Sequence, residues 1–164
     1  MTQPQFKHRV ARLLRRAPWL IAVPYYFTRV IHARYSLGAV GVIINADDKV
    51  LLVEHAFHPK TPWGLPGGWV GRRENPARTV ARELQEELSI QADVGPVVLV
   101  DRPYANHLDI AYLCTSTDPI SQLSYELLSH DWFDRDALPR LLEFHYHAIQ
   151  HAFHIRHALA QSGR

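Results

Sequence analysis

Three glutamates close together in the chain are the residues best suited to chemistry: Glu83, Glu86 and Glu87. On a helix, side chains three and four positions apart lie side by side, so these carboxylates share one face. Like charges at this spacing destabilise an isolated helix by about 0.3 kcal/mol per pair, and Arg82 offsets part of the repulsion by pairing with Glu86. The cluster is therefore either a solvated helix face or a site whose charge a cation compensates.

The segment before this helix favours the cation site. Leu65-Pro66-Gly67-Gly68 supplies two glycines, whose backbone can approach a ligand closely, and Glu74 adds a carboxylate just ahead of the helix. Carboxylate and carbonyl oxygens are the hard ligands that Mg²⁺ and Mn²⁺ prefer, with phosphate and water completing the coordination shell. The pattern thus favours a divalent cation that acts on a phosphate compound.

The local signals for the helix itself are strong. Asn75 suits the N-cap and Pro76 suits the first helical position, so we expect a helix from Pro76 to about Leu88. Its apolar positions fall on one side and predict the face that packs on a sheet: Ala77, Val80, Ala81, Leu84 and Leu88.

Other segments predict the sheet. Apolar, β-branched stretches indicate strands over residues 36–45, 49–54, 94–100 and 110–115, with a further strand ending at Trp132-Phe133 and a short extended piece at Trp69-Val70. Asp47-Asp48 predicts a turn that joins the first two strands as a hairpin. Helices are expected over residues 136–142 and 143–160, and the second is expected to pack through a stripe of Ala148, Ala152, Ile155 and Leu159. Strands in hairpins and around helices indicate an α/β fold with a mixed sheet and helices on its faces.

The spacing of the acidic residues resembles the Nudix box, G-x5-E-x7-R-E-U-x-E-E-x-G-U, in which U is aliphatic. The match runs from Gly68 through Glu74 to Arg82-Glu83-Leu84-Gln85-Glu86-Glu87-Leu88-Ser89-Ile90, and only the final glycine, replaced by Ser89, departs. The Leu-Pro-Gly-Gly before the box, and Trp132-Phe133 and Asp136-Ala137-Leu138-Pro139 after it, are similar to segments that many members carry. Over residues 36–142 the chain is identified as a member of the Nudix hydrolase family.

The resemblance implies a Nudix-type α/β/α sandwich with a mixed β-sheet over residues 36–164, with a basic helical extension over residues 1–35 and a C-terminal helix. It also implies hydrolysis of a nucleoside diphosphate linked to another moiety, with water attacking phosphorus and Mg²⁺ or Mn²⁺ as cofactor. The residues that match metal ligands of the family are Gly68, through its carbonyl, and Glu83, Glu86 and Glu87.

The resemblance assigns roles to the neighbouring residues as well. Arg82 orients the glutamates, and Glu74 braces the box. Glu83 is the first choice for the general base and Glu126 the second, although Glu126 is also interpretable as a solvated residue at the end of a strand. Ser89 predicts a helix end that closes differently or under strain, and Arg72-Arg73-Glu74 replaces the usual x-Gly-Glu turn without removing a carboxylate.

Substrate contacts are expected from aromatic and basic residues near the box. Trp63, Trp69 and Tyr104 offer faces on which a base stacks, and Arg72 and Arg73 offer charge for phosphate. The alternative for the aromatic residues is packing in loops and core. Spacing alone does not choose the nucleotide.

Charge is unevenly distributed along the chain. The first 46 residues carry seven basic and no acidic side chains, whereas the other 118 carry 11 basic and 16 acidic ones. Apolar residues at helical spacing predict a basic amphipathic helix near the start: Phe6, Val10, Leu13, Leu14 and Ala17. The extension over residues 1–35 thus has three interpretations: contact with an anionic membrane surface, contact with RNA, or packing on the core or on a second copy in a homodimer.

Two alternative functions follow from these observations. The basic extension favours an RNA 5′-end pyrophosphohydrolase. A catalytically silent nucleotide-binding or nucleotide-sensing protein is the other, and the complete set of glutamates counts against it. A helical run of imidazoles at His147, His151 and His154 is either a solvated face or a site for a transition metal or a pH switch.

Cysteine content indicates the compartment. The single Cys114 excludes an internal disulfide framework and fits a reducing environment, so a cytoplasmic location is expected. No apolar run has the length of a membrane span, and the stretch over residues 17–27, broken by Pro18 and Pro24, is a poor signal peptide.

Overall fold

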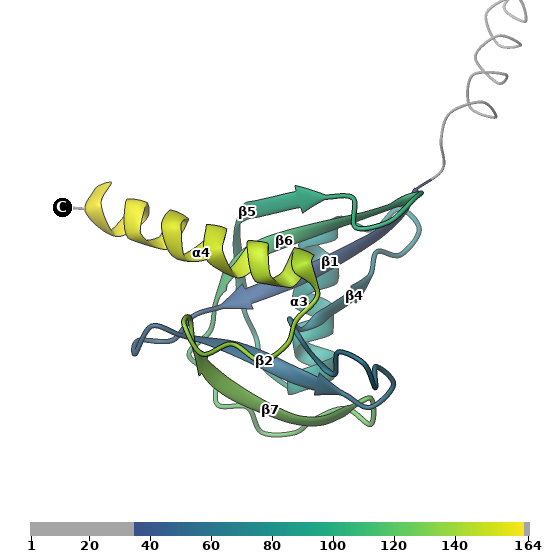
Figure 1. Ribbon diagram of the computed structural model, residues 1–164, viewed down its shortest axis with the longest axis horizontal. Helices are drawn as coiled ribbons and strands as arrows, with labels where there is room; N and C mark the ends of the chain where they lie inside the picture. Colours follow the sequence, from purple (N-terminus) through teal and green to yellow (C-terminus); the bar gives the residue numbers. More distant parts are fainter. Residues whose placement is uncertain (1–34, 163–164) are drawn as a thin grey trace, which may run out of the picture. The chain divides into compact units, whose positions relative to one another are not determined.

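The strands divide into two sheets (Figure 1). In the computed structural model, which describes residues 35–162, the first sheet has the order β4-β1-β6-β5 and is mixed, because β1 is parallel to β6 and antiparallel to β4. Its strands are β1 (Ser36–Ile43), β4 (Gly67–Trp69), β5 (Asp93–Asp101) and β6 (His107–Thr115). The second sheet, of order β3-β2-β7, is antiparallel and contains β3 (Trp63–Gly64), β2 (Lys49–His55) and β7 (Leu127–Asp134).

The expected hairpin between residues 36–45 and 49–54 is wrong, although both strands form. Their one bridge near the turn joins Ile44 and Val50, after which β1 pairs with β6 and β2 pairs with β7. Both strands are buried on both faces, since successive residues pack into different cores. Such a strand has no polar face to keep at the surface, so each becomes the centre of its own sheet.

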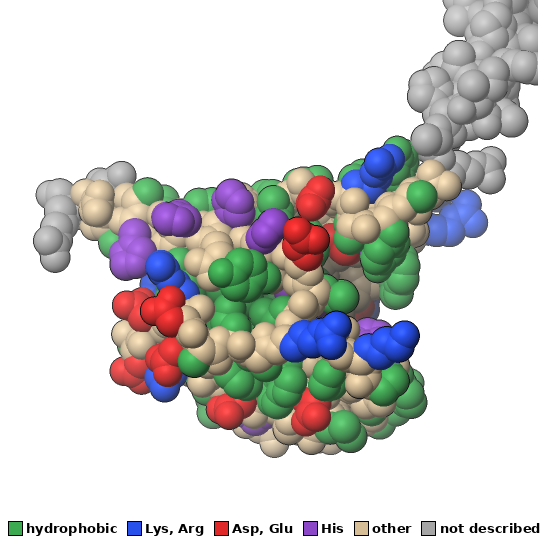
Figure 2. Space-filling view, viewed as in Figure 1, with side chains coloured by type: hydrophobic (Ala, Val, Ile, Leu, Met, Phe, Trp, Pro, Cys, Tyr) green, Lys and Arg blue, Asp and Glu red, His purple; other side chains and the backbone are tan. Residues whose placement is uncertain are grey.

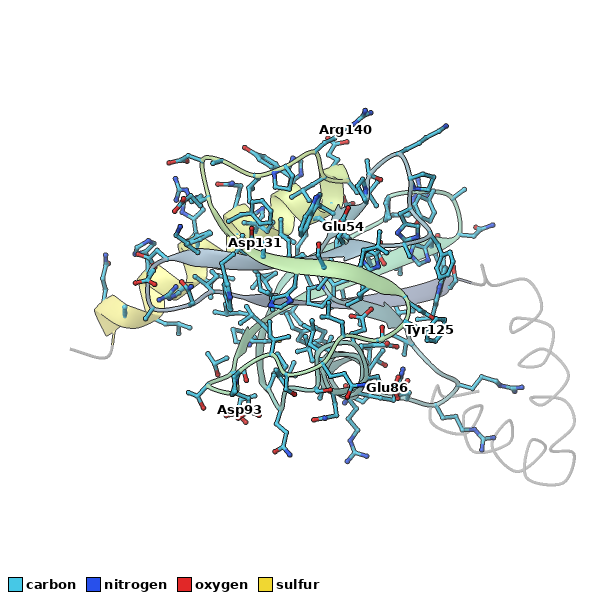
Figure 3. All side chains as sticks on the ribbon, turned by 90° about the horizontal axis from the view of Figure 1, so that it is seen from below. Glu54, Glu86, Asp93, Tyr125, Asp131 and Arg140 are labelled. Carbon is cyan, nitrogen blue, oxygen red and sulfur yellow. The ribbon has the colours of Figure 1, made fainter. Side chains whose placement is uncertain are left out.

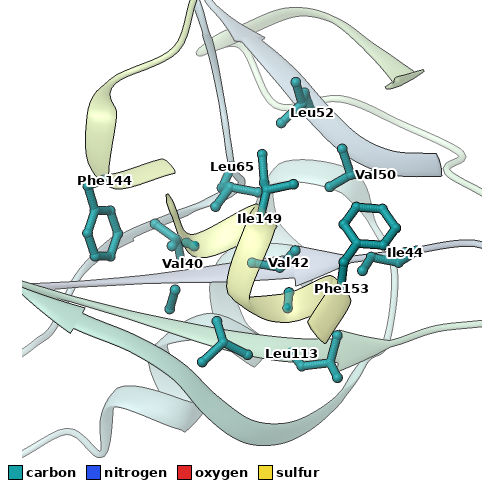
Figure 4. Close-up of a cluster of buried hydrophobic side chains, with 14 residues drawn as sticks. Val40, Val42, Ile44, Val50, Leu52, Leu65, Leu113, Phe144, Ile149 and Phe153 are labelled. Carbon is teal, nitrogen blue, oxygen red and sulfur yellow. The ribbon is translucent and has the colours of Figure 1, made fainter. Parts of the chain in front are cut away.

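Two helices cover the mixed sheet on opposite faces. From α4 (Glu143–Ser162), Ile149 and Phe153 pack with Val42 of β1 (Figure 4). From α3 (Pro76–Leu88), apolar side chains that include Leu84 pack with Ile43 of β1. The α/β/α sandwich with a mixed sheet is therefore confirmed for the described residues.

Two expectations near the C-terminus are wrong. Residues 136–142 form turns and irregular chain rather than a helix, and Pro139 disfavours a helical conformation of the residue before it. The expected packing stripe of α4 holds at Ala148 and Ala152, both fully buried, but Leu159 is 56% exposed. Figure 1 shows the reason, because the last turns of α4 extend past the edge of the sheet.

Within residues 35–162, no helix is both long and apolar enough to span a bilayer. Cys114 lies in the core without a disulfide partner, and burial raises the pKa of its thiol to about 12. The amphipathic helix expected near the N-terminus lies outside the described residues.

Candidate active site

Helix α3 begins and ends where the sequence predicts. Asn75 has extended backbone and its side-chain oxygen accepts the amide hydrogen of Ala77 over 2.9 Å, so it caps the helix as expected. Ser89 closes the other end in the left-handed conformation with φ of 56°, and its amide donates to the Gln85 carbonyl. The helix thus closes in the way glycine closes one, and Ser89 carries the strain of that conformation.

Arg82 is the centre of a network of carboxylates. Its Nη1 donates to Oε1 of Glu83 over 2.8 Å and to Oε2 of Glu86 over 3.0 Å, while its Nε donates to Oε1 of Glu74 over 3.1 Å. Glu74 also accepts the amide hydrogen of Gly71 over 2.8 Å. The hydrogen bond from Arg82 is the main reason that the pKa of Glu74 falls to about 2. One guanidinium therefore holds three carboxylates in place, from the loop before α3 to the last turn of the helix.

Glu87 is the buried member of the cluster. Its side-chain Oε2 accepts the amide hydrogen of Gly67 over 3.0 Å, and the residue is only 7% exposed. Burial raises its pKa to about 8, although the Gly67 hydrogen bond acts the other way, and the charge of Glu83 adds to the rise. Burial also raises the pKa of Glu83. The helix thus holds carboxylates whose negative charge is poorly compensated.

The Gly67-Gly68 segment lies directly against these carboxylates. A Cβ atom at Gly68 would lie 2.5 Å from Oε1 of Glu83, so a larger residue displaces that carboxylate. Gly67 has φ of 147° and approaches the backbone of Ala39, which leaves no room for a side chain. The two glycines are therefore required by close approach to the acidic helix and to β1.

The structure also brings Glu126 to this cluster. It is exposed in the segment before β7, and its backbone carbonyl accepts the amide hydrogen of Ala56 over 2.9 Å. Its charge contributes to the raised pKa values of Glu83 and Glu87. Figure 3 shows Glu86 and Tyr125, the neighbour of Glu126, on the same side of the view. The charge of Glu126 therefore acts on Glu83, the other candidate for the general base.

The donor set of this region suits a divalent cation. Glu83, Glu86 and Glu87 offer hard carboxylate oxygens, and the raised pKa values mark negative charge that a cation would compensate. Among residues 35–162, no three His, Cys, Asp or Glu side chains already form a cage for an ion. Arg82 and the Gly67 amide occupy oxygens of these glutamates instead. The carboxylates are therefore chemically suited to bind a divalent cation. To bind one, the glutamate side chains must rotate away from Arg82 and from the Gly67 amide.

An aromatic wall lies beside the glycine segment. Trp69, 63% exposed, meets the ring of His107 edge-on at 4.9 Å between centroids, and Tyr104 stacks on the same ring at 4.9 Å with an interplanar angle of 13°. Trp69 and Tyr104 line a cleft with Gly67 and Gly68. This cleft is the place where a flat base could contact the protein next to the acidic helix.

The other residues expected to contact the substrate are either partly in the core or outside the cleft. Trp63 lines the cleft but also packs edge-on against Phe133 at 5.0 Å, so part of its ring belongs to the core. Arg72 and Arg73 are exposed in the turn before α3 and are not among the residues that line the cleft. Arg73 has φ of 64°, which shows that the turn without the usual glycine still uses a left-handed residue.

Sequence reasoning missed five titratable residues that line the cleft: His55, His58, His107, Asp109 and His145. His107 is buried, with Nδ1 2.8 Å from the hydroxyl of Ser36 and Nε2 2.9 Å from Oδ1 of Asp109. The alternation of His107 and Asp109 on a strand was a usable signal, because residues two apart share a face. His55 and His58 are only three residues apart in the chain, but His145 comes from α4, and nothing local in the sequence joins it to them.

The expected histidine run of α4 is a surface feature. His147, His151 and His154 are exposed, and Figure 2 shows histidine side chains gathered along the upper edge of the molecule, where α4 lies. Within the described residues these side chains do not belong to any group of three that could hold a metal.

Comparison with known proteins agrees with this architecture. The sequence profile of the NUDIX domain matches residues 34–152. The structure is similar to a MutT NUDIX hydrolase from Burkholderia pseudomallei, with a TM-score of 0.63 and 25% identity, covering 72% of this chain and 98% of that one. It is also similar to an ADP-ribose pyrophosphatase from Streptococcus suis, with a TM-score of 0.61 and 25% identity, covering 75% of this chain and 91% of that one.

A curated relative, the NAD-capped RNA hydrolase NudC of Erwinia tasmaniensis, is 32% identical over 102 residues, which are 61% of this chain and 39% of NudC. The chain spans between 39% and 66% of the length of four curated relatives that it matches. The α/β/α sandwich and the acidic helix define a Nudix-type domain. Since the profile covers most of its length, the chain belongs to the NUDIX domain family.

Proposed function

We propose that this protein hydrolyses a pyrophosphate bond in a nucleoside diphosphate linked to another moiety, with water attacking phosphorus. The observation that carries the proposal is the cluster of Glu83, Glu86 and Glu87 beside Gly68, in which burial raises the pKa of Glu83 and Glu87. On a solvated helix face the carboxylates would be exposed to water. Here Glu83 and Glu87 are partly buried and repel each other, which argues against a solvated face. Members of the family are named hydrolases and pyrophosphatases, which supports the same reaction.

The proposed roles follow from the contacts. Arg82 orients Glu83 and Glu86 through its hydrogen bonds, and Glu74 braces Arg82 from the other side. Glu83 is the proposed general base, because its raised pKa makes it a better proton acceptor than an ordinary carboxylate. Glu126, whose charge acts on Glu83, is the second candidate for that role.

Mg²⁺ or Mn²⁺ is the proposed cofactor. Glu83, Glu86, Glu87 and the carbonyl of Gly68 are the groups that would hold it. A bound divalent cation neutralises phosphate charge and lowers the pKa of a bound water. This chain's own residues supply the carboxylates, the proton acceptor and the orientation of both.

The cleft beside the glycines is the proposed substrate site. Trp69 and Tyr104 are proposed to contact the base, since both are exposed and line the cleft. Trp63 is a weaker candidate because it also packs against Phe133. Arg72 and Arg73, outside the cleft lining, are proposed to reach only a substrate that extends past the turn before α3.

The experiment that tests the function is a screen of nucleoside diphosphate compounds with Mg²⁺ or Mn²⁺, run in ¹⁸O-labelled water with products identified by mass spectrometry. The panel includes dinucleotides, nucleotide sugars, triphosphates and RNA with a 5′-triphosphate. We expect one class to give nucleoside monophosphate or a shortened polyphosphate carrying one ¹⁸O atom. Binding without hydrolysis across the panel would support the silent nucleotide-binding alternative instead.

Organisation and location are proposals too. We propose a catalytic domain over residues 36–164, an appended basic segment over residues 1–35, and a cytoplasmic location. The RNA 5′-end alternative is supported by the basic residues of that segment. Co-sedimentation with RNA or with anionic vesicles at low and moderate salt separates these partners, since both contacts weaken with salt. Analytical ultracentrifugation of the full chain decides whether it forms a homodimer.

A further inference from the structure

Two histidines that are close together in the chain and a third from far along it line the same cleft. His55 ends β2, His58 follows it in the next loop, and His145 belongs to the first turn of α4. The ring centroids of His55 and His58 are 5.0 Å apart. A Cβ atom at Gly64 would lie 3.0 Å from the ring of His145 and 3.4 Å from Nε2 of His55. All three rings line the same cleft as Gly67 and Gly68.

The backbone selects one form of His145. The amide hydrogen of Leu65 points at Nδ1 of His145 over 3.2 Å, so Nδ1 accepts and carries no proton. A neutral ring must then carry its proton on Nε2, which makes Nε2–H a donor. Burial, with the nearby rings of His55 and His58, lowers the pKa of His145 to about 4, in agreement with a neutral ring. In the described part of the chain, no acceptor is hydrogen-bonded to Nε2.

The charged groups around this trio leave the site open to an anion. Asp109 lines the same cleft, but one of its oxygens is 2.9 Å from Nε2 of His107. Glu126 acts on His55 only electrostatically. Within residues 35–162 no carboxylate is hydrogen-bonded to His55, His58 or His145, and the three rings do not form a metal cage. Imidazole N–H groups that have no acceptor within the protein are able to donate hydrogen bonds to phosphate oxygens.

We propose that His145, with His55 and His58 beside it, binds a phosphate group of the substrate and donates Nε2–H to a phosphate oxygen. The site rests on the proposed hydrolysis, because it places this phosphate next to the Gly67-Gly68 segment and the acidic helix. The imidazoles bind the phosphate group that water does not attack, because the cleft that they line includes Gly67 and Gly68 but not the side chains of Glu83, Glu86 and Glu87. His145 is a substrate-binding residue in this arrangement, held in register by the Leu65 amide.

The first test is binding of inorganic phosphate to the full chain, followed by long-range ¹H–¹⁵N spectra of the histidine rings. Before phosphate is added, the spectrum should show His145 protonated on Nε2 alone from pH 6 to pH 8. Phosphate should then shift the signals of His55, His58 and His145 and leave that of His151 in place, since His151 is exposed on α4 outside the cleft. Equal small shifts at all histidines, or none, would overturn the proposal.

The second test compares three variants. His145→Phe keeps the ring volume but loses both nitrogens, His145→Gln keeps an acceptor and a donor, and His151→Gln is the matched control on the same helix. We expect His145→Phe to weaken phosphate binding and raise KM about tenfold with kcat changed less than threefold. His145→Gln should recover part of the loss, and His151→Gln should match the wild type. A fall in kcat with unchanged KM and phosphate affinity would show a structural role and overturn the proposal.

The two tests separate this site from the proposed reaction. If phosphate shifts the three histidines but no compound in the screen is hydrolysed, the phosphate site stands and the hydrolase function fails. If hydrolysis occurs and neither KM nor phosphate affinity responds to His145→Phe, the function stands and the phosphate site fails. Thermal unfolding of each variant establishes that it is folded before either result is used.

Discussion

The Nε atom of Arg82 donates to Oε1 of Glu74 over 3.1 Å, across the boundary between the loop and helix α3. The same guanidinium reaches Glu83 and Glu86 through Nη1. Arg82 is only partly exposed, so the fork of donors is held between loop and helix rather than moving freely in solvent. The position of the acidic side chains therefore depends on the planar shape of arginine and not only on its charge.

Replacing Arg82 by lysine tests this dependence. Lysine keeps the positive charge but cannot contact Glu74, Glu83 and Glu86 at once. We expect Arg82→Lys to remain folded and to lose between about tenfold and a hundredfold in kcat, measured with the substrate that the screen identifies. The control is Arg78→Lys, an exposed arginine one turn earlier on the same helix, which should keep wild-type activity. Equal activity of both variants would show that charge alone suffices.

Glu86 provides the test of the cofactor. Its side chain is 59% exposed and its neutral analogue preserves the shape, so Glu86→Gln should fold as the wild type does. We expect most Mg²⁺-dependent turnover to disappear, because the variant lacks a carboxylate proposed to hold the cation. Isothermal titration should show weaker Mg²⁺ binding. Gln85→Ala, at the adjacent exposed position, should change neither quantity, and unchanged turnover of Glu86→Gln would contradict the assignment.

The general base is decided by comparing Glu83→Gln with Glu126→Gln. A general base contributes about 10² to 10⁴ in rate, so we expect Glu83→Gln to lose that factor in kcat and the acidic limb of the pH–rate profile. Glu126→Gln should lose less than tenfold in kcat and keep the acidic limb, because Glu126 is exposed and only the second candidate for the role. The reverse order of losses would transfer the role to Glu126.

Glu87 makes stability depend on pH in the metal-free protein. Its pKa is about 8 in the folded chain against an ordinary value of 4.5, so the unfolded chain ionises first. Above pH 4.5 the free energy of unfolding therefore falls as pH rises, and the loss is complete above pH 8. We expect the loss to be on the order of 3 kcal/mol between pH 5 and pH 8, measured by urea unfolding with chelator present.

The control for this effect is a pair of neutral replacements. Glu87→Gln mimics the protonated side chain, so its free energy of unfolding should not fall over the same range. Glu143→Gln, at an exposed position at the start of α4, should retain the wild-type fall. If Glu87→Gln and the wild type show the same pH dependence, burial of Glu87 is not its cause.

Ser89 offers a test of backbone strain. With φ of 56° it occupies the left-handed conformation, which costs a residue with a side chain about 1 kcal/mol or more. Ser89→Gly removes that strain but increases the entropy of the unfolded chain, so we expect a net stabilisation of about 0.5 kcal/mol. Ser89→Ala must adopt the same φ and should bring no gain. Chemical denaturation of the three proteins measures both differences.

The elements of the site that depend on local spacing were predictable from the sequence. Asn75 and Pro76 define the start of α3 because capping involves residues adjacent in the chain. Glu83 and Glu86 share a face because the helix repeats every 3.6 residues. The residue ranges of the main strands were predictable for the same reason, since β-branched and apolar runs are local. Their pairing was not, because β1 and β2 each found partners elsewhere in the chain.

The sequence by itself therefore determined the acidic helix, its caps and the glycine segment that precedes it. Tertiary structure decided what surrounds them. The packing of α4 on the sheet brings His145 next to His55 and Gly64. His145 is far from both residues in the chain, so no short-range sequence pattern could predict this contact. Burial likewise raises the pKa of Glu87, although Glu86 beside it in the chain is exposed. Periodicity is a property of neighbours along the chain, whereas burial and long-range contact are properties of the folded whole.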